Sequence, residues 1–351
     1  MILPKEEVQR ILNELKTIKG PAIWTDIHVC PYEVIFNSFE YFPNPYEKGI
    51  YSLASVPYKP PEVGPLILKP RPVEKKIRGT GKKDLTYSRL IYKKYFTHIG
   101  PKFFIDQMQL SGIDRCLLLP VFQPQSDGRA EMDFIHRLYW QEKRLYLGYC
   151  VPNKIKNEEI INDLNRAILS FGIKAIKFNA NIAEINLSQK EGRERLDTII
   201  RAAAVFQLPV IIHGGKSEIL KNSEASDYSS LDNLARTSIR TARTPIIISH
   251  AGLFGAGLEE IGTRLLPLLI EILSENENIM VSVSGLETPA LESLLREVSA
   301  DRILFGSDFP YFSQWGAIIK LWMVLKKISK DPLTSFQKIV SENSKRLWAG
   351  G

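Results

Sequence analysis

The sequence PVIIHGG, residues 209–215, is the part of the chain that says most about its fold. An unbroken apolar run follows Pro209, and the run ends in a histidine and two glycines. PIIISHAG, residues 245–252, has the same arrangement. Unbroken apolar runs are typical of parallel strands covered on both faces, whereas half-exposed strands alternate apolar and polar residues. The two stretches therefore predict buried parallel strands that carry polar side chains at their C-terminal ends.

Similar runs recur along the whole chain. They lie at 22–28, 115–120, 145–150, 174–178, 209–213, 245–250, 279–284 and 302–308. The segments between them carry apolar residues at helical spacing, for example 157–172 and 191–206. Eight strands that alternate with helices predict an α/β fold of the (β/α)8 TIM barrel type. A doubly wound open sheet is the second choice, but its glycine-rich phosphate-binding turn follows none of the runs.

The basic charge of the chain is concentrated in one segment. The net charge is +7, yet residues 48–102 alone carry 13 lysines and arginines against three acids. This segment is also rich in proline, which is unsuited to the interior of a sheet. We therefore predict one domain over residues 1–351, with a long basic, proline-rich insertion at about 31–100, after the first strand. On the rim of the barrel, its Arg71 and Arg78 would attract an anionic substrate.

Composition limits the location and partners of the protein. The hydrophobic content of 44% and the charged content of 24% are typical of soluble globular proteins. No apolar run approaches the roughly 20 residues that span a bilayer, and the N-terminal residues do not resemble a signal peptide. Three widely separated cysteines argue against a disulfide framework. We expect a cytoplasmic protein with a small-molecule substrate and no membrane partner. A nucleic-acid or acidic-protein contact of the basic segment is a weaker alternative, since no nucleic-acid-binding motif accompanies the charge.

Histidines and acids gather at the predicted strand ends. The residues are Asp26, His28, Cys30, His213, His250 and Asp308. In a barrel these ends meet at one mouth, and alternation along the first strand would point Asp26, His28 and Cys30 inward together. Imidazoles plus a carboxylate form catalytic zinc, iron or manganese sites, where a bound water loses its proton near neutral pH and a nearby His or Asp moves that proton. The joint pattern therefore predicts a metal site.

Single residues of this pattern have simpler explanations. A lone histidine at a strand end is more often a hydrogen-bonded structural group than a ligand, and Cys30 is equally typical of a small buried apolar residue. His98 lies in the predicted insertion and His136 lies within a predicted helix. These two histidines do not join the set.

The order of the motifs resembles a known family. D-I-H at 26–28, IIHGG at 211–215, ISHAG at 248–252 and LFGSDFP at 304–310 are similar to motifs of the amidohydrolase-related metal-dependent enzymes. That family includes aminocarboxymuconate-semialdehyde decarboxylase and the resorcylate-type decarboxylases. The likeness covers about 22–30 and 101–349 and leaves out the insertion. It implies a divalent metal in the barrel mouth, usually Zn²⁺ and sometimes Mn²⁺, and it also implies a homodimer.

The resemblance implies a role for each matching residue. His28 and His213 match metal ligands, and Asp308 matches a carboxylate that binds the metal and takes part in proton transfer. His250 matches a histidine that activates water or stabilises the reacting group. Lys177 falls where the wider superfamily sometimes has a carbamylated lysine that bridges two metals. Because the metal is usually single in this branch, we interpret Lys177 as a structural or substrate-binding residue.

The first strand departs from the family pattern. Most relatives have a second histidine where this chain has Cys30. A decarboxylase branch lacks that histidine and uses an acid two residues before the position of His28, where this chain has Asp26. Either Asp26 or the Cys30 thiolate could therefore complete the metal site, and we favour Asp26. Loss of the metal is the third alternative.

Three functions follow from these alternatives. The first is a metal-dependent hydrolase that acts on a small, anionic substrate through a metal-activated water. The second is a non-oxidative decarboxylase, a carbon–carbon lyase, that uses the same metal site. The third is a catalytically inactive barrel that acts as a binding protein, and Cys30 is the feature in its favour. The presence of His28, His213, His250 and Asp308 together favours an enzyme.

Overall fold

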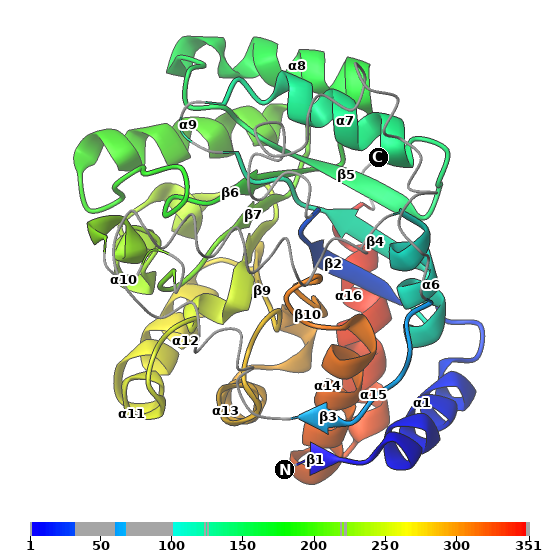
Figure 1. Ribbon diagram of the computed structural model, residues 1–351. Coiled ribbons are helices and arrows are strands. Elements are labelled where there is room, and N and C mark those ends of the chain that lie inside the picture. Colours follow the sequence, from blue (N-terminus) through cyan, green and yellow to red (C-terminus); the bar gives the residue numbers. More distant parts are fainter. Residues whose placement is uncertain are drawn as a thin grey trace.

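Eight parallel strands form the centre of the protein, as the predicted barrel requires (Figure 1). The computed structural model describes residues 2–31, 60–67, 101–122, 124, 126–217, 220 and 223–348. The strand order is β10-β9-β8-β7-β6-β5-β4-β2. Each strand overlaps one of the predicted runs. The strands are β2 (Thr25–Val29), β4 (Arg115–Leu118), β5 (Leu145–Cys150), β6 (Ala175–Phe178), β7 (Val210–Ile212), β8 (Ile246–Ile248), β9 (Ile279–Ser282) and β10 (Ile303–Leu304). The TIM-barrel prediction is confirmed.

The barrel closes between β2 and the segment that runs through and beyond β10. The Ile27 amide donates to the Phe305 carbonyl over 3.1 Å, and the Asp308 amide donates to the His28 carbonyl over 2.9 Å. A parallel bridge pairs Val29 with Phe309. The first and last strands of the barrel are thus neighbours, and their C-terminal ends bring His28 beside Asp308.

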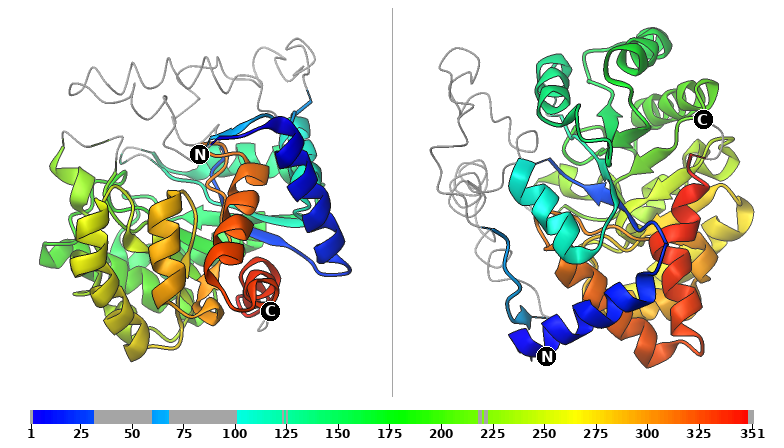
Figure 2. Two further views of the ribbon diagram at one scale, coloured as in Figure 1. Left: turned by 90° about the horizontal axis from the view of Figure 1, so that it is seen from below. Right: turned by 90° about the vertical axis from the view of Figure 1, so that its right-hand side faces the viewer.

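Helices surround this sheet on the outside (Figures 1 and 2). The helices are α1 (Lys5–Lys19), α6 (Pro101–Ser111), α7 (Arg129–Tyr139), α8 (Ile160–Phe171), α9 (Lys190–Val205), α10 (Leu231–Leu234), α11 (Leu258–Glu260), α12 (Leu266–Glu275), α13 (Thr288–Glu297), α14 (Gln314–Ile328), α15 (Pro332–Gln337) and α16 (Asn343–Lys345). Their buried faces follow the helical period, as Ile160, Leu164 and Ala167 of α8 illustrate. Within the described residues, no helix has the length and apolar character needed to cross a membrane.

The interior of the barrel is filled by a separate apolar cluster. Its buried members are Ile27, Leu117, Leu119, Ala175, Ile211, Ile247, Met280, Leu304 and Leu347. Along a strand, every second residue points to the same face. Lys177, His213 and Ser249 each lie two residues beyond a member of this cluster, so they point into the barrel one level nearer its mouth. The apolar cluster therefore lies directly below the polar residues, on the side away from the mouth.

The chain start is tied to part of the predicted insertion. β1 (Ile2–Leu3) pairs with β3 (Leu66–Ile67) as a two-stranded antiparallel sheet. Leu66 packs against the main core and lies beside Gly316 of α14, where an added Cβ would be 3.1 Å from Leu66 Cδ1. Of the predicted insertion at about 31–100, only residue 31 and residues 60–67 are described. Arg71, Arg78 and His98 lie outside the described residues.

Candidate metal centre

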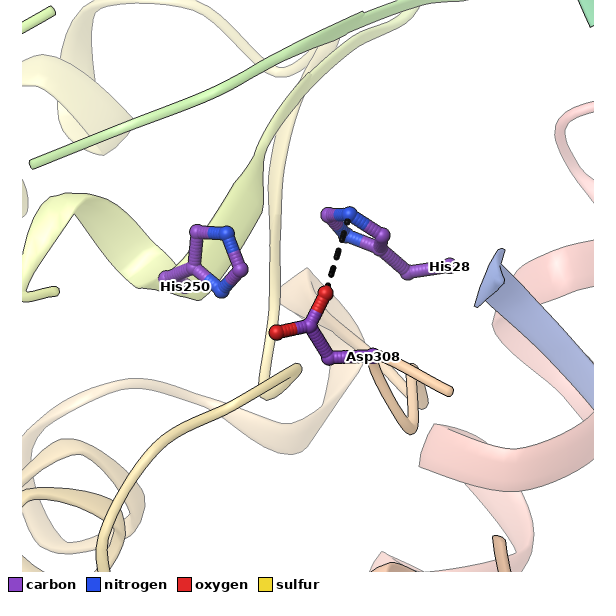
Figure 3. A group of neighbouring side chains, drawn as sticks. All are labelled: His28, His250 and Asp308. Carbon is purple, nitrogen blue, oxygen red and sulfur yellow. Dashed lines mark ion pairs between the residues drawn. The ribbon is translucent and has the colours of Figure 1, made fainter. Parts of the chain in front are cut away.

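Three of the predicted site residues converge at the mouth of the barrel (Figure 3). His28, His250 and Asp308 each offer a ligand atom, and these atoms lie within 4.8 Å of one another. His28 lies on β2, His250 follows β8 and Asp308 follows β10. His28 Nε2 is 3.6 Å from Asp308 Oδ1. All three side chains are buried. The structure thus brings together residues from the first, sixth and eighth strands of the barrel.

His213 lies beside this group but not within it. Its ring is 4.9 Å from the ring of His250, measured between centroids. Its Nε2 is buried and has no hydrogen-bond partner among the described residues. A buried polar atom without a partner costs free energy, so such atoms in native proteins commonly meet water, an ion or a ligand. His213 Nε2 is therefore free to serve a bound group at this mouth.

The backbone at two of these residues adopts an uncommon conformation. His250 and Asp308 have φ values of 57° and 63°, and Ala251 after His250 has a φ of 52°. Residues other than glycine pay an energetic cost in this left-handed region, and they persist there only where the surrounding structure holds them. The chain therefore turns sharply directly after β8 and after β10, and these turns place His250 and Asp308 against His28.

The three histidines are neutral at neutral pH. Burial is the largest cause that lowers the pKa of His28, His213 and His250, and the positive charge of Lys177 contributes in each case. For His250 the pKa falls to about 3. Neutral imidazole is the form that binds metal ions, because the coordinating nitrogen must keep its lone pair. The site therefore presents imidazoles in the metal-binding state.

Lys177 is buried within the barrel beside His28. Its Nζ lies 3.3 Å from His28 Nε2 and donates to Ser249 Oγ over 3.3 Å. Burial lowers the pKa of this amine. Lys177 Nζ and Asp308 Oδ1 thus both lie near His28 Nε2. Lys177 therefore borders the candidate site from inside the barrel.

Asp26 does not lie on the same side as His28, contrary to the expected alternation. The pairing of β2 with β4 shifts register between Asp26 and Val29, so the strict two-residue period is broken there. Asp26 instead faces α14 and the segment after β10. Its carboxylate accepts hydrogen bonds from the Ser307 amide, the Ser307 hydroxyl, Gln314 Nε2 and the His28 amide. Both of its oxygens are engaged in joining β2 to its neighbours.

Cys30 lies nearer to the group. Its Sγ donates weakly to Asp308 Oδ1 over 3.9 Å. Burial, followed by the negative charge of Asp308, raises the pKa of the Cys30 thiol above its usual value. Cys30 therefore stands beside the group as a neutral thiol rather than as a thiolate.

Three further residues line the group and were not predicted from the sequence. Ser284 contacts both His28 and His250 through its hydroxyl. A side chain at Gly285 would lie 3.0 Å from Asp308 Oδ2. The partly exposed ring of Phe254 lies 4.7 Å from the ring of His250. For Ser284, the sequence feature that could have indicated a site residue is the alternation of Ser282 and Ser284 with valines at the end of the run 279–284.

The arrangement fits a divalent cation. Two imidazoles and one carboxylate are a usual ligand set for zinc or manganese, and three protein ligands leave a position open for water or substrate. The unpartnered Nε2 of His213 adds a further donor beside them. The residues present could therefore hold such an ion at the mouth of the barrel.

Replacement of Asp26 by alanine tests whether Asp26 is a metal ligand or a structural hydrogen-bond acceptor. Loss of this carboxylate leaves its buried donors unpaired, at a cost of about 1–3 kcal/mol for each group left unsatisfied. We expect a large loss of stability in urea unfolding, with an unchanged metal-to-protein ratio in the protein that remains folded. Cys30→Ala is the matched variant and should change stability less. Loss of bound metal from folded Asp26→Ala protein would instead make Asp26 a ligand.

Comparisons with known proteins extend these observations. A family model described as amidohydrolase matches residues 141–350. No curated protein sequence matches the chain. Among solved structures, the chain is similar to 5-carboxyvanillate decarboxylase from Sphingomonas paucimobilis, with 11% identity, a TM-score of 0.59 and coverage of 93% of this chain and 98% of that one.

Two further structures have a similar fold. 4-Oxalomesaconate hydratase from Rhodopseudomonas palustris is 15% identical, with a TM-score of 0.57 and coverage of 93% of this chain and 96% of that one. 5-Carboxyvanillate decarboxylase from Novosphingobium aromaticivorans, complexed with manganese and 4-hydroxy-3-methoxy-5-nitrobenzoic acid, is 15% identical, with a TM-score of 0.55 and the same coverage. At these identities the likeness establishes a shared fold.

Proposed function

The chain belongs to the amidohydrolase family, whose members are metal-dependent enzymes, and we propose that it decarboxylates a small carboxylate substrate. In this proposal His28, His250 and Asp308 hold one divalent cation, Zn²⁺ or Mn²⁺, and His213 completes the shell or faces the substrate. The convergence of these three ligand atoms within 4.8 Å carries the proposal. The role of the cation, when bound, is to hold the substrate carboxylate and to stabilise negative charge.

The surroundings of the group favour loss of CO₂. The ligand side chains are buried, and the Phe254 ring packs against both His250 and His213, at 4.7 and 6.1 Å between centroids. When CO₂ leaves, the negative charge of the carboxylate passes to the substrate carbon, and a site with little water favours this transfer of charge. Lys177, inside the barrel, supplies a cationic group that suits an anionic substrate.

The reaction needs one proton for each CO₂ released. As the bond between the substrate carbon and its carboxylate breaks, the electron pair remains on that carbon, and a proton must be delivered there. Asp308 and His250 are the proton-carrying groups at the mouth. A well-positioned acid of this kind contributes about 10²–10⁴-fold to rate. We assign this delivery to Asp308, whose Oδ1 lies 3.6 Å from His28 Nε2 and 3.9 Å from Cys30 Sγ at the mouth of the barrel.

Hydrolysis is the second candidate. A specific observation favours it, because His213 Nε2 is a buried nitrogen without a partner among the described residues. Such a nitrogen could orient a water molecule or take its proton as that water attacks an ester, lactone or amide carbonyl. The same ligand group would serve this reaction.

A substrate panel distinguishes the two reactions. Purified protein loaded with zinc or manganese would be mixed with hydroxylated benzoates and unsaturated dicarboxylates, with CO₂ release and absorbance as readouts. A parallel panel would contain lactones, esters and amides. We expect metal-dependent CO₂ release that a chelator removes and added metal restores. Hydrolysis without CO₂ release would transfer the assignment to the second candidate, and protein that binds no divalent metal would overturn both.

A further inference from the structure

We infer that Ser284 is a positioning residue that fixes the proton of His28 on Nδ1, so that the Nε2 lone pair points to the cation. This inference rests on the proposed metal site. Ser284 is fully buried two residues beyond the end of β9. Its Oγ lies 2.9 Å from His28 Nδ1 and 3.1 Å from His250 Nδ1. One hydroxyl therefore touches two of the three grouped residues.

The proton on His250 is fixed independently of this hydroxyl. His250 Nδ1 lies 2.8 Å from the backbone carbonyl oxygen of Ser284. A carbonyl oxygen only accepts, so His250 Nδ1 carries the proton and donates it. His250 Nε2 is then the nitrogen with the lone pair. Because the acceptor is backbone, this part of the arrangement does not depend on the Ser284 side chain.

The proton on His28 is favoured on Nδ1 by contacts on both sides of the ring. His28 Nε2 faces Asp308 Oδ1 at 3.6 Å and Lys177 Nζ at 3.3 Å. The lysine Nζ carries N–H donors and already donates to Ser249 Oγ, so it favours a lone pair on Nε2. His28 Nδ1 then carries the proton and donates it to Ser284 Oγ. The Ser284 hydroxyl hydrogen remains available for Ser282 Oγ, 2.9 Å away.

The packing around Ser284 keeps this contact close. A Cβ at Gly306 would lie 2.8 Å from the Cβ of His28 and 3.0 Å from the Cβ of Ser284. Real Cβ atoms avoid such distances, so only glycine at 306 lets β2 and the end of β9 approach across the mouth. The contact between Ser284 and His28 is thus set by the barrel itself.

The contact would matter because the outer partner of a metal-binding histidine sets its tautomer and ring orientation. Loss of such a partner typically lowers metal affinity by about 10–100-fold. In Ser284→Ala, His250 keeps its backbone acceptor while His28 loses its only described Nδ1 partner. We therefore expect zinc affinity to fall by about 10–100-fold, with His28 as the altered ligand.

The experiment is ¹⁵N NMR of the histidine side chains in metal-free protein, followed by zinc titration. In the natural sequence we expect the Nδ1–H tautomer at both His28 and His250. In Ser284→Ala, only the His28 signals should shift toward the other tautomer. Ser284→Thr keeps a hydroxyl, so its His28 signals should match those of the natural sequence. Ser341→Ala is the matched control, because Ser341, which follows α15, is a buried serine whose hydroxyl has no partner among the described residues.

Two outcomes would overturn the inference. An Nε2–H tautomer at His28 in the natural sequence would contradict it without use of any variant. Unchanged His28 signals and zinc affinity in folded Ser284→Ala would show a merely structural serine. By contrast, a protein with the expected tautomers that binds no metal would overturn the proposed function and leave the role of Ser284 toward His28 intact.

Discussion

Asp308→Asn is expected to lower zinc affinity by at least about 100-fold, the upper range seen when only the outer partner of a ligand is lost. Asp308 is the one carboxylate among the three grouped residues, and the two histidines beside it are neutral. It therefore supplies the negative charge of the group. Asparagine has nearly the same shape but no charge, so the Coulomb attraction to a divalent cation is lost. Decarboxylation should fall by a further 10²–10⁴-fold, roughly the contribution of a general acid. Zinc titration and CO₂ release measure the two effects.

The control for this variant is Asp301→Asn. Asp301 is an exposed carboxylate just before β10, at the end of that strand opposite the mouth, and it pairs with Lys338 Nζ at 2.8 Å. It should keep the metal affinity and activity of the natural sequence. Full zinc affinity in folded Asp308→Asn would remove Asp308 from the ligand group, and His213 would then be the remaining candidate for a third protein ligand.

Gly285→Ala is expected to destabilise the protein and to weaken metal binding together. Gly285 has a φ of 63°, and a Cβ there would lie 3.0 Å from Asp308 Oδ2 and 3.2 Å from His250 Nδ1. The left-handed backbone costs an L-residue about 1–2 kcal/mol. Crowding in a packed region adds about 1–3 kcal/mol. Because two grouped residues would have to move, zinc affinity should fall as well. Urea unfolding and zinc titration test this.

Gly172→Ala separates the two causes. Gly172, at the end of α8, has a similar φ of 61°, yet nothing lies within 4 Å of its would-be Cβ. It should lose only the backbone contribution of about 1–2 kcal/mol and keep its zinc affinity. Equal losses of stability in the two variants, with unchanged zinc binding in both, would mean that Gly285 does not shape the metal group.

The strands could be predicted from the sequence because buried parallel strands leave a strong local signal. The runs around Val210–Ile212 and Ile246–Ile248 are apolar on both faces, and a turn or a helix on the surface would not tolerate them. The polar residues at the C-terminal ends of these strands then predicted the site, because the C-terminal ends of all barrel strands lie at the same mouth. His28, His250 and Asp308 were found in this way.

Other features depend on contacts that local pattern does not record. Asp26 was expected to point inward with His28, but the register shift after it depends on how β2 pairs with β4 and on the closure of the barrel at Phe305 and Phe309. Ser284 ends the predicted run 279–284, which is apolar apart from two serines and lies partly beyond β9 in the structure. Its importance appears only when β2 approaches from the opposite end of the sequence.

The closure of the barrel has a consequence for the order of assembly. Cys30 and Asp308 are 278 residues apart along the chain, and His28 meets Asp308 only where the first and last strands join. During synthesis, the N-terminal half of the site emerges long before its partner, since translation adds about 5–20 residues each second. The candidate metal centre would therefore form late in folding, and an ion bound there would link the first and last strands of the barrel.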